Sequence, residues 1–162
     1  MTDIDLPPDP RDRRRAAFHE AGHAVVAWAL GLEVRWVRLL PETEDSAGKI
    51  DRQTADHLPP EDQIAVLMGS WWSTEMCDVP QVYPAEFEMD EVQTYIVMRR
   101  TFPDDDEAQE DLRERGIARA KELVVRHAKS VALVAEKLER RGELLAGEVA
   151  RLVTGPDSLA GA

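Results

Sequence analysis

The sequence predicts a mainly α domain of the α+β class, with one small β-sheet or hairpin after the first helix. Apolar residues recur at helical spacing through most of the chain, and only one apolar segment alternates as a strand does. The chain has 162 residues, of which 43% are hydrophobic and 32% charged, so it suits one domain with a buried core. We divide it into a flexible lead-in, a folded domain and a disordered tail, at residues 1–8, 9–153 and 154–162.

The first helix is expected from residue 9 to about residue 30. Asp9 suits the N-cap position, and Pro10 suits the first helical position. Nearly every residue from 16 to 30 is apolar, which is typical of a helix buried around most of its circumference. Gly31 then provides a natural end.

The segment "EVRWVRLLP" after the first helix predicts a strand that a proline ends. The alternation places Val34 and Trp36 on one face and Val37 and Leu39 on the other. After a loop, "GKIDRQ" predicts a second, short strand. We expect these two strands to be the whole of the β structure.

The rest of the chain predicts helices. Each begins near prolines or acidic residues, which suit a helix N-terminus, and then turns apolar at helical spacing. A loop broken by two prolines precedes the second of them, and Gly142 separates the last two. The expected helices span about residues 60–76, 86–103, 103–141 and 143–153.

Composition and charge argue against several classes of protein. The net charge of −12, from 20 basic and 32 acidic residues, disfavours nucleic-acid binding and attachment to anionic membranes. No apolar run reaches the roughly 18–20 residues that span a bilayer, and the amino terminus "MTDIDLPPDP" lacks the features of a signal peptide. The single cysteine, Cys77, excludes an internal disulfide. We therefore expect a cytoplasmic protein.

The first helix contains the sequence HEAGH at residues 19–23, an HExxH motif. Two imidazoles and a carboxylate in an apolar helix are costly to bury unless each has a partner. His19 and His23 lie one turn apart on one helical face, so both can reach a single tetrahedral metal ion. Glu20 projects beside them, where it can take a proton from a metal-bound water. The motif predicts a catalytic zinc site.

Such a site has three protein ligands and a water, so the third ligand must come from another segment. A cluster of four acidic residues occurs where the second of the later helices begins, well placed to dock on the first helix. Spacing alone does not choose among those four. The candidates along the whole chain are His57, Glu75, Glu86, Glu88, Asp90, Glu91 and His127.

The segment "AAFHEAGHAVVAWALGLEVRWVRLLPE" resembles the proteolytic domain of the FtsH family of zinc metallopeptidases (M41 type), and this resemblance implies a helical zincin-like domain. "FEMDEVQTYIVM" is similar to the family segment that carries an aspartate as third zinc ligand. Asp90 matches it best, because Thr94 follows one turn later. Glu88 and Glu91 remain the alternatives. The segment from 71 to 83 departs from the family in composition.

The resemblance implies that His19, His23 and Asp90 bind zinc and that Glu20 is the general base of an endopeptidase. Gly22 would let another backbone or helix approach the metal. The predicted strand at 34–40 would hold an extended peptide by edge pairing. The alternative is a weakly active or inactive zinc-binding protein that serves as an interaction or regulatory module.

The resemblance also bears on partners. Family members usually carry an AAA ATPase module and membrane helices ahead of the peptidase, and the sequence contains neither these nor a phosphate-binding loop motif. Substrates are therefore expected to be peptides or unfolded proteins, alone or delivered by a separate ATPase or other partner. The oligomeric state is left open.

Overall fold

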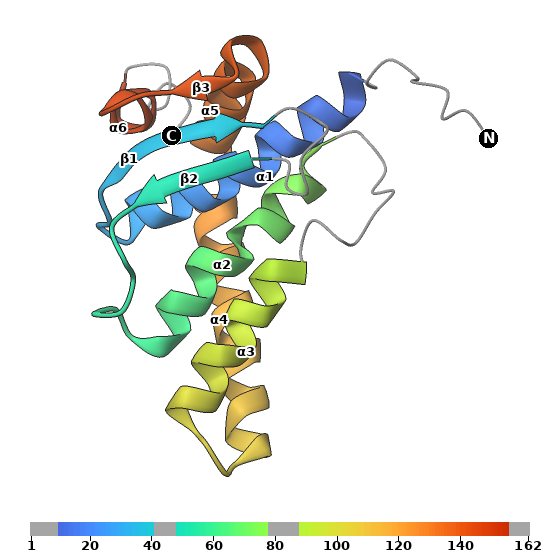
Figure 1. Ribbon diagram of the computed structural model, residues 1–162, viewed down its shortest axis with the longest axis vertical. Coiled ribbons are helices and arrows are strands. Elements are labelled where there is room, and N and C mark those ends of the chain that lie inside the picture. Colours follow the sequence, from blue (N-terminus) through green and yellow to red (C-terminus); the bar gives the residue numbers. More distant parts are fainter. Residues whose placement is uncertain (1–9, 41–47, 78–87, 156–162) are drawn as a thin grey trace, which may run out of the picture.

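The computed structural model describes residues 10–40, 48–77 and 88–155. It is mainly helical with one three-stranded antiparallel sheet, which confirms the predicted fold class (Figure 1). The predicted lead-in, the prolines of the loop before α3 and all but the first two residues of the predicted tail lie outside the described residues. In chain order the elements are α1 (Pro10–Ala29), β1 (Val34–Leu39), β2 (Gly48–Arg52), α2 (Pro60–Glu75), α3 (Glu88–Thr101), α4 (Asp106–Arg126), α5 (Ala128–Arg141), β3 (Glu143–Leu144) and α6 (Glu148–Thr154).

Helix α1 is the central element of the fold, as its composition predicts. Ala17, Ala21 and Val25 lie on one face of the helix and Val26 lies on the opposite face, and all four are fully buried. One core cluster joins α1 to the sheet, α5 and α6, and a second joins it to α2, α3 and α4. The helix ends where Gly31 adopts a positive φ of 83°. Functional groups on the middle part of α1, residues 15–27, are therefore surrounded by other elements.

The sheet has the order β2-β1-β3, with β1 in the middle. The predicted faces of β1 are partly wrong, because a β-bulge between Val34 and Trp36 shifts the alternation. Val34 consequently packs against the core together with the buried Val37. Trp36 stays on the outer face, where the Arg38 guanidinium lies 4.5 Å from its ring centre.

The carboxy-terminal part differs from the prediction in a third strand, in two helix starts and in the division of one helix. The helix expected from residue 143 begins at Glu148, because residues 143 and 144 form β3 and pair with Arg38 and Val37 of β1. The single helix expected from 103 to 141 begins at 106, with the Asp105 side chain as its N-cap, and is divided at His127. The division lets α4 pack in the α2 cluster while α5 packs against α1 and the sheet.

Helices α1 and α2 cross in close contact at two glycines. A Cβ at Gly22 would lie 2.5 Å from the carbonyl oxygen of Gly69 and would collide with the Ser73 hydroxyl. A Cβ at Gly69 would lie 2.8 Å from a methyl group of Val26. Ser73 Oγ also donates a hydrogen bond of 2.6 Å to the carbonyl oxygen of Phe18. The HExxH helix is thus held backbone to backbone against α2.

Replacing Gly22 with alanine should destabilise the protein. The methyl group meets the backbone of Gly69, which cannot move aside as a flexible side chain can. We expect the free energy of unfolding to fall by about 1–3 kcal/mol, although alanine gains about 1 kcal/mol in helix propensity over glycine. Urea unfolding followed by circular dichroism measures the change. A variant as stable as the wild type would show that the two helices separate without cost.

Among the described helices, none is both long enough and apolar enough to cross a membrane.

Candidate metal centre

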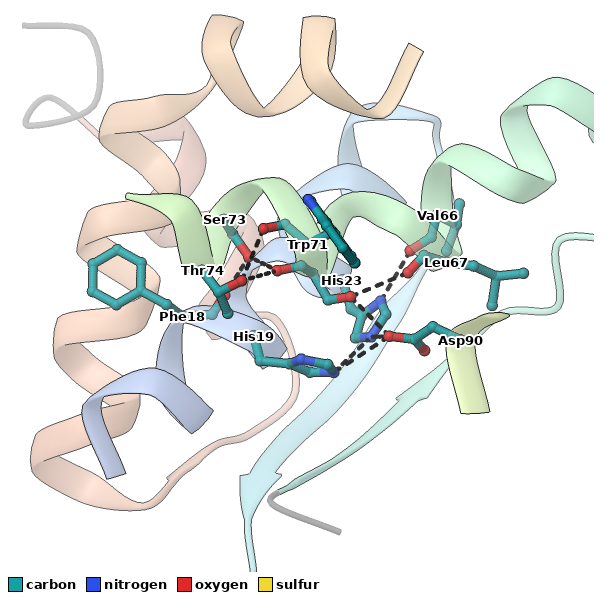
Figure 2. Close-up of polar contacts among 10 residues, drawn as sticks. Phe18, His19, His23, Val66, Leu67, Trp71, Ser73, Thr74 and Asp90 are labelled. Carbon is teal, nitrogen blue, oxygen red and sulfur yellow. Dashed lines mark hydrogen bonds and ion pairs between the residues drawn. The ribbon is translucent and has the colours of Figure 1, made fainter. Parts of the chain in front are cut away.

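The HExxH motif lies on the inner part of α1, where the two histidines are 6% and 8% exposed and Glu20 is 4% exposed. The i, i+4 spacing sets the rings of His19 and His23 on one face, with their centroids 4.9 Å apart and their planes at 76°. Both rings point toward the start of α3 (Figure 2). Three polar groups are therefore buried together.

Asp90, in the first turn of α3, completes the cluster. Its Oδ2 lies 3.5 Å from His19 Nε2 and 3.2 Å from His23 Nε2, and the two Nε2 atoms lie 3.2 Å apart. Three corners of a tetrahedron with zinc bonds of about 2.0–2.1 Å are about 3.3–3.4 Å apart. The three donor atoms therefore have the mutual spacing that a tetrahedral zinc ion requires. Two imidazoles and one carboxylate are also a donor set that zinc accepts.

Hydrogen bonds with α2 orient two of these donors, and Figure 2 shows the one between His23 and Val66. His23 Nδ1 donates to the backbone carbonyl oxygen of Val66 at 2.9 Å. In the neutral imidazole this leaves the lone pair on Nε2, the atom that faces His19 and Asp90. Ser70 Oγ donates to Asp90 Oδ2 at 2.8 Å. Such outer contacts are typical of protein metal sites.

Burial and mutual charge shift the pKa values of the cluster in opposite directions. Burial and repulsion from His23 lower the pKa of His19 to about 3. Burial also acts to lower the pKa of His23, but attraction to Asp90, a hydrogen bond with it and further attraction to Glu20 outweigh burial and raise the pKa to about 9. Burial acts to raise the pKa of Asp90, yet the charge of His23 and the hydrogen bonds lower it. Without a metal, these directions favour a proton on His23 over one on His19.

Glu20 is close to this cluster but does not belong to the set of donor atoms that converge. Its side chain packs under the first residue of β2, since a Cβ at Gly48 would lie 2.5 Å from Glu20 Cγ. Burial raises the pKa of Glu20 to about 7, with the charge of Asp90 adding to the rise and that of His23 opposing it. A carboxyl group with a pKa near neutrality can accept and release a proton at physiological pH.

The structure separates the candidate third ligands. Asp90 lies beside the two histidines. The other candidates among the described residues lie away from them. His57 and Glu75 are exposed, and Glu91 is exposed beside Arg113, with 3.8 Å between the charged atoms. His127 lies between α4 and α5 against Trp28, with ring centroids 5.9 Å apart. Glu86 and the side chain of Glu88 lie outside the described part of the chain.

Two supporting groups were missed from the sequence, the Val66 carbonyl and Ser70. A backbone carbonyl leaves no mark in the sequence. Ser70 follows Gly69 at the point where α2 meets α1. Its one signal in the sequence was a polar residue within an apolar helix, which needs a hydrogen-bond partner once it is buried. Of the adjacent tryptophans, Trp72 packs in the core and donates to the Ile117 carbonyl oxygen at 3.1 Å, whereas Trp71 is 36% exposed.

Comparison of the sequence with protein-family models finds no match, and comparison with curated proteins finds no significant match. The function proposed below therefore depends on the geometry of the metal centre and on the resemblance carried by the motif.

Replacing Ser70 with alanine should weaken zinc binding without abolishing it. Asp90 keeps its place on α3 but loses the donor that fixes Oδ2. Loss of such an outer contact typically costs about 10–100-fold in metal affinity. Competition with a chromophoric zinc chelator measures the change, and Ser130→Ala, a buried serine on α5, is the matched control. An unchanged affinity in Ser70→Ala would mean that this hydrogen bond does not support the ligand.

Proposed function

We propose that the protein is a zinc-dependent endopeptidase of the FtsH type. The observation that carries the proposal is the convergence of three donor atoms at tetrahedral spacing, with a buried carboxyl group beside them that is not one of the donors. This is the division of roles that HExxH peptidases require: histidines as ligands and a glutamate as base.

The residues would perform the reaction as follows. His19, His23 and Asp90 would hold zinc, and a bound zinc ion would supply a water of lowered pKa and polarise the carbonyl of the scissile bond. Glu20 accepts a proton from the attacking water and later delivers it to the leaving amine. Val66 and Ser70 keep His23 and Asp90 in position. Because Glu20 is buried against Gly48, its carboxyl group is restricted to the neighbourhood of the reacting atoms.

The substrate must reach this site in extended form, and the predicted use of residues 34–40 for edge pairing is wrong. β1 is the central strand: it pairs with β2 on one side and, at Val37 and Arg38, with β3 on the other. Within the described residues, β1 is the strand with which β2 pairs, and β2 is an outer strand of the sheet. Gly48 places this strand against Glu20. We propose that an extended peptide, from an unfolded protein or delivered by a separate ATPase, adds to the edge of β2.

Metal removal tests the function. A mixture of unstructured peptides, analysed by mass spectrometry, should be cleaved at internal bonds by the zinc-loaded protein. A chelator such as 1,10-phenanthroline should stop cleavage, and stoichiometric zinc should restore it. Cleavage that survives full metal removal would contradict the proposal. A protein that holds zinc but cleaves none of the peptides would instead favour the interaction module as the function of the same centre.

A further inference from the structure

Helix α3 exposes an apolar face that nothing in the proposed reaction uses. Seven large hydrophobic side chains among the described residues are exposed, and four of them belong to α3. These are Met89 at 67%, Val92 at 46%, Tyr95 at 53% and Ile96 at 47%. Single exposed apolar residues are ordinary, but a group on one helix is typical of a protein–protein contact. Figure 1 shows α3 beside α2 and α4, at the end of the molecule away from the sheet.

The exposed residues form a regular seam. Met89, Val92, Ile96 and Arg99 follow one another at intervals of three, four and three, the spacing of core positions in paired helices. The opposite face holds α3 to the rest of the protein, through the buried Thr94, Val97 and Met98. α3 thus has two apolar faces, of which the fold covers one.

We propose that a second copy of the chain covers the exposed apolar face of α3. The two α3 helices would pack antiparallel about a twofold axis. The seam is self-complementary in this arrangement, because its intervals of three, four and three residues are the same from either end of the helix. An axis between Val92 and Ile96 places each of these residues opposite the other in the partner copy. It also places Met89 against the aliphatic part of Arg99. Twofold dimers of this kind are the commonest symmetric assemblies of soluble proteins.

The charges of α3 favour the antiparallel direction. Its first turns carry the exposed Glu91, and its last turn carries the exposed Arg99 and Arg100. Antiparallel packing brings the acidic end of each helix near the basic end of the other, and it also aligns the helix dipoles favourably. Parallel packing would bring like charges together.

Sedimentation velocity on the full chain tests the dimer. The wild type should sediment as a dimer once the protein concentration reaches about 100 µM. The double variant Val92→Glu with Ile96→Glu should be monomeric, with a dissociation constant raised by at least about 100-fold. Val125→Glu, an exposed apolar residue on α4, should remain dimeric. Melting curves confirm that each variant is folded.

Cysteine crosslinking tests the direction of packing. Tyr95→Cys lies near the proposed axis and should form an intermolecular disulfide under mild oxidation. Met89→Cys lies near the end of the seam, far from its counterpart in an antiparallel pair, and should not crosslink. A monomeric wild type, or a dimer that survives the double glutamate substitution, would overturn the proposal. Efficient crosslinking of Met89→Cys would overturn the antiparallel arrangement. None of these readouts depends on zinc or on peptidase activity.

Discussion

Replacing His23 with alanine should remove stoichiometric zinc from the protein. The substitution deletes one of three donor atoms and also the contact with the Val66 carbonyl that orients the ring. Zinc sites with four ligands bind with about 10–16 kcal/mol, so one ligand accounts for roughly a quarter of this, or about 10²–10³-fold in affinity. Asp90→Ala should have an effect of the same size. Chelator competition, with metal content measured after dialysis, gives the affinities.

His57→Ala is the matched control, because it also removes an imidazole but from an exposed loop position. It should bind zinc as the wild type does. Thermal melting of the metal-free proteins shows whether each variant folds, so that loss of zinc is not mistaken for loss of structure. Wild-type zinc affinity in His23→Ala or Asp90→Ala would contradict the ligand set. Loss of zinc in His57→Ala would place the ion elsewhere.

Replacing Glu20 with glutamine should abolish peptide hydrolysis while leaving zinc in place. Glutamine has nearly the same shape, so packing against Gly48 is preserved, but its amide cannot accept a proton as the carboxylate does. General-base catalysis contributes about 10²–10⁴-fold, and we expect kcat/KM to fall by that factor. The readouts are the cleavage rate of a fluorogenic peptide and the zinc content of the same sample.

Glu75→Gln serves as the control for the loss of one carboxylate, since Glu75 is exposed at the end of α2. Its activity and zinc content should be unchanged. If Glu20→Gln keeps its zinc and still cleaves the peptide at the wild-type rate, Glu20 is not the base. If it loses the ion, Glu20 contributes to binding rather than to proton transfer alone.

The first helix and the pair of histidines were predictable because both depend on local spacing. A continuous apolar run fixes α1, and the i, i+4 interval fixes the common face of His19 and His23. Asp90 was not predictable from spacing, because both faces of α3 are apolar. Periodicity therefore could not say whether Asp90 or Glu91 turns inward. The structure answers through packing: Asp90 shares the buried face with Thr94 and Val97, whereas Glu91 points to solvent beside Arg113.

The elements that sequence reasoning missed depend on contacts between distant segments. β3 has two residues and forms only because β1 offers a partner more than a hundred positions earlier in the chain. The break at His127 has no glycine or proline to announce it, and it arises because α4 and α5 belong to different core clusters. The bulge in β1 also depends on such contacts, because it lets both Val34 and Val37 pack against the core.

Zinc K-edge absorption of the zinc-loaded wild type tests the central claim most directly. The ligand set of His19, His23 and Asp90 predicts one zinc per chain, bound by nitrogen and oxygen atoms at about 2.0–2.1 Å, with the outer-shell scattering of two imidazoles. Failure to bind stoichiometric zinc would contradict it. So would a spectrum with a sulfur ligand near about 2.3 Å or without imidazole scattering.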